Sequence, residues 1–228
     1  MNDKVLNPCA QKCLQKLMQV WFDFERQLER VPVVERIQRG TFTKDDYLNL
    51  LLNLRQQVIE GSRWIARTAS SFDRDHSDVR SIVLKHAKDE HKDYEILEKD
   101  FCAVGGEREK IESQNKNIGS EALHSFMMFK AGSPNPVGML GAMWIIEGLG
   151  QKMASEWALQ IDEMLGLNGM GTDFMKYHGA NDEAHMDTFY LMLDRLCQGD
   201  KNLSEIVKVS RVTAKLYALQ LEEVDNEG

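Results

Sequence analysis

Two histidines and an aspartate near residue 180 have the residue types and the spacing of metal ligands. His178, Asp182 and His185 follow one another at positions i, i+4 and i+7. In a helix of 3.6 residues per turn, these positions lie within about 60° of one another. Met186 and Phe189 continue the same stripe, so this side of the helix is expected to face the core. Imidazoles and a carboxylate are costly in a core unless they are paired or bound to a metal such as iron, manganese or zinc. Ordinary hydrogen-bonded core histidines are the alternative.

A second segment repeats this spacing about ninety residues earlier in the chain. His86, Glu90 and Asp93 again stand at i, i+4 and i+7, in a gap of an otherwise apolar stripe. His91 is rotated from that stripe by about 100°, which makes it a weaker candidate. A charged face exposed to solvent is the alternative here, because lysines and acids crowd the region.

Two further glutamates are candidates on other helices. Glu147 is a single carboxylate inside the apolar stretch GMLGAMWIIEGLGQKM, where an unpaired anion is strongly disfavoured. We therefore favour a ligand role for Glu147, with a buried partner as the alternative. Glu60, in LRQQVIEGSRW, shares its helix with Arg55 and Arg63, and a surface ion pair explains it at least as well.

Together these segments present more carboxylates and imidazoles than one ion usually takes. The pattern indicates two metal ions bridged by carboxylates, with positions left open for oxygen or a substrate. The repeated Glu-x-x-His of ferritin-like carboxylate proteins is absent from the sequence, which has Asp182-x-x-His185 and Glu90-x-x-Asp93 instead.

The elements that must position these residues are all predicted to be helical. Only four prolines occur, long stretches have helical periodicity, and alternating strand patterns are nearly absent. We predict an all-α single domain over residues 1–228, with about seven to eight helices. Thr43 is predicted to cap one helix, with Asp46 at the capping-box position. The expected helices cover roughly residues 8–30, 33–39, 43–70, 77–103, a broken region at 107–131, then 137–165, the His178 helix to about 199, and 203–222.

Composition restricts the classes of partner. The net charge of −8 disfavours nucleic acid and anionic membrane surfaces, which would repel the chain. No apolar run approaches the roughly 20 residues of a membrane span, and the N-terminus lacks the apolar core of a secretory signal. The four cysteines show no CxxC spacing. A cytoplasmic location is therefore expected.

Four stretches of the chain resemble one known group of helical proteins. These are GTFTKDDYLNLL, DEHKDYEILEKDFCAVGG, WIIEGLGQKMA and the His178-x3-Asp182-x2-His185 motif. Across roughly residues 40–220 the chain resembles the haem-oxygenase-like helical fold of TenA proteins, PQQ-synthesis oxidases and haem-oxygenase-like di-metal oxidases. The last two stretches resemble the ligand helices of the di-metal oxidases in particular.

The resemblance implies a specific ligand set. It makes Glu147, His178, Asp182 and His185 iron ligands and Glu90 the ligand of the acidic helix. The chain departs from the family at Asp93, where the family has a histidine. The resemblance also implies a homodimer.

Two relatives fit the residue types poorly. Haem oxygenase proper needs an axial histidine on its first helix, whereas the first histidine here is His76, so no haem is expected. TenA-type thiaminases need a nucleophilic cysteine on the Glu147 helix. The matching place is close to Ala142, and no cysteine lies between Cys102 and Cys197.

The leading hypothesis is a non-haem di-iron oxidase or oxygenase that acts with O₂ on a small organic substrate, with Mn or Zn as possible metals. A metal-free small-molecule-binding module and a cofactorless oxidase like the PQQ-synthesis enzyme are the alternatives. A Met and aromatic set is predicted to line a substrate pocket, although such side chains also build ordinary cores. Its members are Met143, Trp144, Phe126, Met127, Phe174 and Tyr177.

Overall fold

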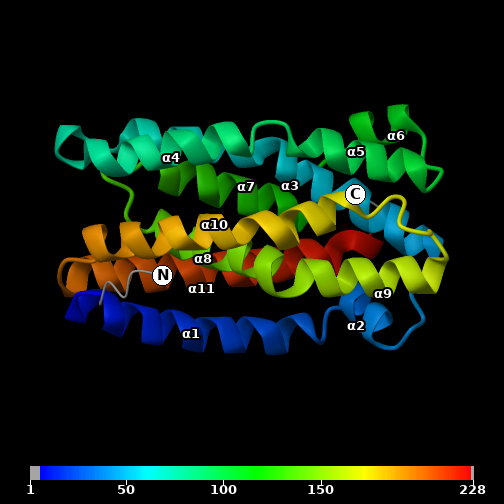
Figure 1. Cartoon of the computed structure of the whole chain (residues 1–228), viewed down its shortest axis with the longest axis horizontal. Coiled ribbons are helices and arrows are strands. Elements are labelled where there is room, and N and C mark those ends of the chain that lie inside the picture. The colour runs from blue at the N-terminus through cyan, green and yellow to red at the C-terminus, as the bar shows by residue number, and fades with distance from the viewer. Residues whose placement is uncertain (1–5, 227–228) are drawn as a thin grey trace.

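The computed structural model describes residues 6–226, apart from the side chains of residues 181–184, and this part of the chain is all helical. Eleven α-helices lie roughly along one direction in an elongated bundle (Figure 1). In chain order they are α1 (Pro8–Leu28), α2 (Pro32–Gln38), α3 (Lys44–Ser71), α4 (Ser77–Asp89), α5 (Asp93–Ala103), α6 (Arg108–Ser113), α7 (Ile118–Ala131), α8 (Met139–Leu149), α9 (Ser155–Leu165), α10 (Asp173–Leu196) and α11 (Asp200–Glu222).

The starts of the first and third helices follow directly from local sequence. The Asn7 side chain accepts a hydrogen bond from the backbone of Ala10, and Pro8 occupies the first turn of α1, where its missing N–H costs nothing. Thr43 and Asp46 form the predicted capping box at the start of α3. These caps fix where two long helices begin, before any tertiary contact is made.

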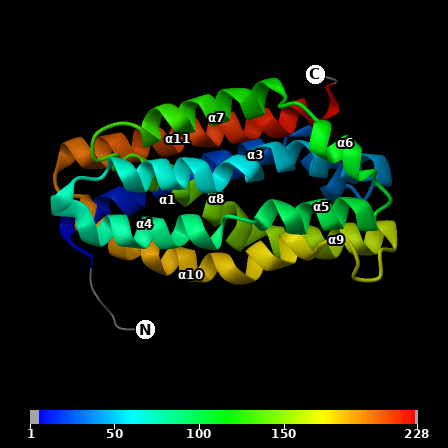
Figure 2. The same cartoon turned by 90° about the horizontal axis from the view of Figure 1, so that it is seen from above.

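The predicted number of about seven to eight helices was too low, because two expected helices are interrupted and the broken region at 107–131 contains two helices, α6 and α7. The expected helix over 77–103 divides into α4 and α5 at residues 90–92, which lie end to end in Figure 2. The break contains neither glycine nor proline, the residues that most often interrupt helices, so the sequence does not indicate it. Asp93 instead opens α5, where its carboxylate lies near the positive end of the helix dipole.

The expected helix from 137 to 165 is also not uniform. Its axis continues from α8 into α9, but residues Gly150–Ala154 between them form a π-helical turn. Such turns shift the register of the following helix and occur frequently at functional sites. The turn follows Glu147 by three residues and packs against α10.

Close helix packing depends on small residues. A Cβ on Gly141 of α8 would lie 2.1 Å from the carbonyl oxygen of Ile206 on α11, and on Gly179 of α10 it would lie 1.9 Å from Ser155 Oγ. These glycines let α8 approach α11 and let α10 approach the start of α9. The core between the helices is filled by side chains such as Trp21, Phe24, Tyr47, Phe101 and Phe189, each at most 2% exposed.

Within residues 6–226, no helix has the length and the apolar character that crossing a membrane requires.

Candidate metal site

Six side chains from four segments converge near the middle of the bundle. His86, Glu90, Glu147 and His185 each offer one ligand atom, and these four atoms lie within 4.8 Å of one another. Glu90, Asp93 and His178 form a second such group. We call these six residues the carboxylate–histidine cluster. Glu90 belongs to both groups, so its carboxylate lies between two sets of possible ligands.

The helix break and two neighbouring helices create this arrangement. His86 lies in the last turn of α4, Glu90 is the residue that caps its C-terminus, and Asp93 begins α5. Glu147 comes from α8 and the two remaining histidines from α10. The turn between α4 and α5 thus places two carboxylates on either side of a bend, where a straight helix would have stacked them along one stripe.

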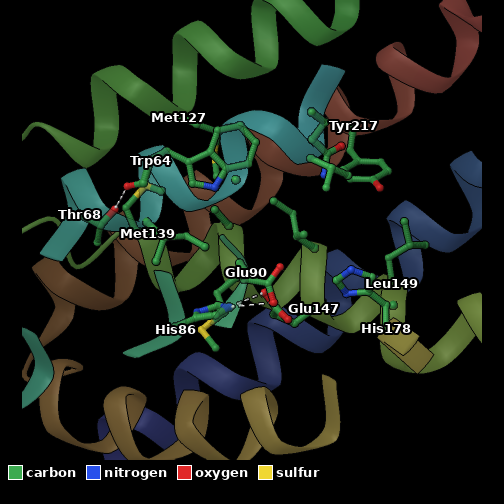
Figure 3. A pocket seen from close by; sticks show the side chains of 18 of the residues that line it. Trp64, Thr68, His86, Glu90, Met127, Met139, Glu147, Leu149, His178 and Tyr217 are labelled. Atoms are coloured by element: carbon green, nitrogen blue, oxygen red, sulfur yellow. Dashed lines mark hydrogen bonds and ion pairs between the residues drawn. The ribbon is translucent and has the colours of Figure 1, made fainter. Parts of the chain in front are cut away.

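The first group is built around Glu147. Its Oε2 lies 2.9 Å from His185 Nδ1 and its Oε1 lies 3.2 Å from His86 Nε2. Glu90 Oε1 lies 3.5 Å from His185 Nδ1 and 3.8 Å from His86 Nε2. The two imidazole rings are 4.3 Å apart between centroids. Figure 3 shows His86, Glu90 and Glu147 directed toward one point.

The second group is smaller and pairs an aspartate with a histidine. Asp93 Oδ2 lies 3.4 Å from His178 Nε2. The His178 ring packs against Phe174 at 4.6 Å and against Tyr177 at 5.5 Å, measured between ring centroids. These aromatic contacts restrict the orientation of the imidazole.

The cluster holds three carboxylates and three imidazoles but no lysine or arginine. Burial and the neighbouring Glu147 carboxylate raise the pKa of Glu90 to about 8. Burial also raises the pKa of Asp93, although the nearby His178 imidazole opposes it. Burial by itself would raise the pKa of Glu147, but the adjacent imidazoles of His185 and His86 outweigh it, so this pKa is lowered. The anionic form of Glu90 is thus disfavoured beside the Glu147 carboxylate.

Two buried atoms in the cluster fit a metal ion. His86 Nε2 and Asp93 Oδ2 have almost no solvent contact, and neither forms a well-directed hydrogen bond with a described residue. Their nearest charged neighbours are Glu147 Oε1 at 3.2 Å and His178 Nε2 at 3.4 Å, respectively. Buried polar atoms are rarely left in this state. A cation in each group would coordinate one of these two atoms, and its positive charge would reduce the repulsion between Glu90 and Glu147.

Solved structures of other proteins share this architecture. A domain of unknown function with a haem-oxygenase-like fold from Shewanella denitrificans matches with a TM-score of 0.86 and 21% sequence identity, over 92% of this chain and 91% of that chain. The chain has the haem-oxygenase-like fold.

Two TenA homologues have the same architecture at lower sequence identity. The protein from P. horikoshii gives a TM-score of 0.74 at 14% identity, covering 96% of this chain and 98% of its own. The protein from Pseudomonas syringae pv. tomato gives 0.77 at 13% identity, covering 98% and 95%. No protein-family model and no curated protein sequence matches this chain. At these sequence identities, the similarity to the solved structures shows a shared fold only.

In this haem-oxygenase-like bundle the cluster opens onto an apolar cavity of about 170 Å³. His86, Glu90, Glu147 and His178 all line it. The facing wall comes largely from α3, α7 and α8, and it includes Trp64, Thr68, Met127 and Met139, which Figure 3 labels. The α3 wall was missed at the sequence level, although its residues repeat at helical spacing.

The structure brings together most of the predicted ligands but not all of them. His86 lies in the cluster, whereas the weaker candidate His91 is exposed on the turn between α4 and α5. Glu60 is buried elsewhere, among Lys116, Arg63 and His124. Of its two expected partners, Arg63 does pair with Glu60, whereas Arg55 pairs with Glu98. The side chain of Asp182 lies outside the described residues.

The predicted pocket residues divide in the same way. Met143, Met127 and Phe174 line the cavity, whereas Trp144, Phe126 and Tyr177 do not. The Trp144 indole donates a hydrogen bond to the Leu17 carbonyl at 3.0 Å and so ties α8 to α1. The sequence places Trp144 on an apolar helix face, and this does not show whether the side chain packs between helices or lines a pocket.

Proposed function

We propose that this protein is a non-haem di-metal oxidoreductase, with iron as the metal, that activates O₂ on a small organic substrate. The observation that carries the proposal is the position of Glu90. Its carboxylate lies within 4.8 Å of the other possible ligand atoms in each of the two groups. This is the position expected of a carboxylate that bridges two ions.

The two ions would be held by different residue sets. His86, Glu147 and His185 would hold one, Asp93 and His178 the other, and Glu90 would be shared. The spacing of Asp182 relative to His178 and His185 makes it a further ligand candidate. Bound non-haem iron supplies the O₂ chemistry that protein side chains cannot perform by themselves.

The chain's own residues would orient the ligands and keep the site dry. The 2.9 Å contact between His185 Nδ1 and Glu147 Oε2 fixes the direction of that imidazole. The Phe174 and Tyr177 rings do the same for His178. Apolar side chains such as Val83, Met143 and Ile146 line the cavity and would exclude water around a bound substrate.

Metal content measured after anaerobic Fe(II) addition tests the proposal. Wild-type protein should retain two ions per chain, Glu90→Ala should retain almost none, and His86→Ala and His178→Ala should each retain one. His91→Ala is the matched control, because this exposed histidine lies on the same turn and outside the cluster. Retention of less than one ion per chain by the wild-type protein would contradict the proposal. Loaded protein should then consume O₂ when candidate substrates are added.

A metal-free small-molecule-binding protein on the same fold is the second candidate. The His185–Glu147 contact favours it, because imidazoles can neutralise a buried carboxylate without any metal. Under this alternative, His185→Ala lowers stability and leaves metal content near zero in both proteins. A cofactorless oxidase would consume O₂ even after treatment with a chelator.

A further inference from the structure

A surface groove lies directly outside the apolar cavity. Pro136 and Met139 line both the groove and the cavity, so the two spaces meet at these residues. The groove is formed by the end of α7, the loop before α8 and the start of α11. These segments lie together at one end of the bundle, the left end in Figures 1 and 2.

The groove differs from the cavity in its charge. Lys130, Lys201 and Lys208 line it, against a single glutamate, Glu205. Lys130 pairs with Glu205 at 2.6 Å, whereas Lys201 and Lys208 are exposed and form no ion pair with a described residue. The only other ionisable residue in the lining, His76, lies 2.7 Å from Asp73. In a chain of net charge −8, this groove is a local site of positive charge that would attract an anion.

The cavity leads from this groove to the carboxylate–histidine cluster. Met139 opens α8 and Glu147 lies eight residues further along the same helix, which corresponds to about 12 Å at 1.5 Å per residue. Trp64, Thr68, Phe72 and Met127 line the space between them. This passage suits an apolar group and not a charged one, because its walls would not compensate the lost hydration of an ion.

We propose that the substrate is an amphiphile that binds with its anionic group in the lysine-lined groove and its apolar segment in the cavity. The apolar end remote from the anion then meets the cluster. This inference rests on the proposed function for the reaction at that end. The binding geometry itself requires no metal, and it can therefore be tested in chelator-treated protein.

Titration calorimetry at low ionic strength with three probes tests the binding mode. Decyl phosphate carries both parts of the proposed ligand, decanol carries the chain without the charge, and inorganic phosphate carries the charge without the chain. Decyl phosphate should bind about threefold to tenfold more tightly than decanol, as expected for one or two exposed charge pairs. Inorganic phosphate should bind most weakly. Equal affinities for decyl phosphate and decanol would overturn the proposal.

A pair of double variants locates the charge. Lys201→Ala/Lys208→Ala should remove the preference for decyl phosphate and leave the affinity for decanol unchanged. Lys99→Ala/Lys110→Ala is the matched control, because it removes the same charge on α5 and α6, at the other end of the bundle (Figure 2). If both double variants reduce the preference equally, the effect is general electrostatics and the groove is not the site.

A change at Met139 tests the passage. Met139→Trp should weaken binding of both chain-bearing probes at least tenfold while helical content and Fe(II) content stay at wild-type values. Unchanged affinity for both probes would contradict entry past Met139. Protein that shows the binding pattern but retains no metal would contradict the proposed function alone, and metal-loaded protein without the pattern would contradict this inference alone.

Discussion

Glu60 and Glu147 are buried to nearly the same degree, with 5% and 7% of their surface exposed, yet their surroundings are opposite. Glu60 Oε1 accepts a hydrogen bond from Lys116 Nζ at 3.0 Å, and Glu60 Oε2 accepts one from Arg63 at 2.6 Å. Glu147 is next to two imidazoles and a second carboxylate.

The difference between the two sites lies in the partners. Lysine and arginine carry permanent charges, so Glu60 is neutralised without any further ion. Imidazoles are themselves metal ligands when neutral, and the Glu147 group contains more carboxylates than fixed positive charges. A buried acid in an apolar segment is therefore no metal signature by itself. The residues that the fold brings to it decide its role.

The largest expected effect separates the two glutamates by metal content. Glu147→Gln removes an anionic ligand of the four-residue group, so we expect it to lose about half of the bound iron, because the group of Glu90, Asp93 and His178 remains. Glu60→Gln should retain the wild-type content. Inductively coupled plasma mass spectrometry after anaerobic loading measures both. Equal loss in the two variants would remove the distinction.

The next effect concerns stability. Glu60→Gln leaves Lys116, whose side chain is 20% exposed, without its charged partner. We expect the free energy of unfolding to fall by about 1–3 kcal/mol, the range for breaking a partly buried charged hydrogen bond. Urea denaturation of chelator-treated protein gives the value. A variant as stable as wild type would show that the ion pairs of Glu60 contribute nothing measurable.

A smaller effect should appear in acid. Burial alone would raise the pKa of Glu60, but Lys116, His124 and Arg63 outweigh it and lower this pKa below its ordinary value of 4.5. The stabilisation from Glu60 is therefore present above pH 4.5 and is lost as the pH falls through the lower value of the folded state. Melting temperatures of chelator-treated proteins should decline more between about pH 6 and pH 3 for wild type than for Glu60→Gln. Parallel curves would contradict this.

The smallest expected effect concerns Lys116. Replacing it tests whether its positive charge is what prevents a metal ion from binding at Glu60. Lys116→Gln leaves Glu60 with Arg63 and His124, a set with too few ligands for an ion. Fe(II) content should stay at the wild-type value, and the unfolding free energy should fall by about 0.5–1 kcal/mol. An additional bound ion in this variant would show that charge, and not ligand number, separates the two glutamates.

Some features of the structure were predictable from residue type and spacing. The all-helical class and the capping box of Thr43 are confirmed, because periodicity and capping are local properties of the chain. The haem-oxygenase-like fold, which the resemblance implied, is confirmed as well. The i, i+7 relation of His178 and His185 did place both in one cluster, since α10 is continuous there.

Other features depended on contacts that no local pattern encodes. His86 is buried in the last turn of α4, whereas His91 is exposed on the break that follows, and the position of that break came only from the structure. The break contains no glycine or proline by which it could have been predicted. The expected pairing of Glu60 with an arginine of its own helix is confirmed for Arg63, but its second cationic partner, Lys116, comes from a segment 56 residues away.

The sequence alone determined which side chains could bind a metal and that they lie on amphipathic helices, because ligand chemistry and helical period are properties of residues and their neighbours. Only the tertiary structure decided that Glu90 lies between two ligand groups, that Glu60 lies among cations, and that a lysine-lined groove meets the apolar cavity at Met139. The physical reason is the same in each case. The free energy of a buried charge depends on the few groups within several ångströms of it, and in a helical bundle those groups come from distant parts of the chain.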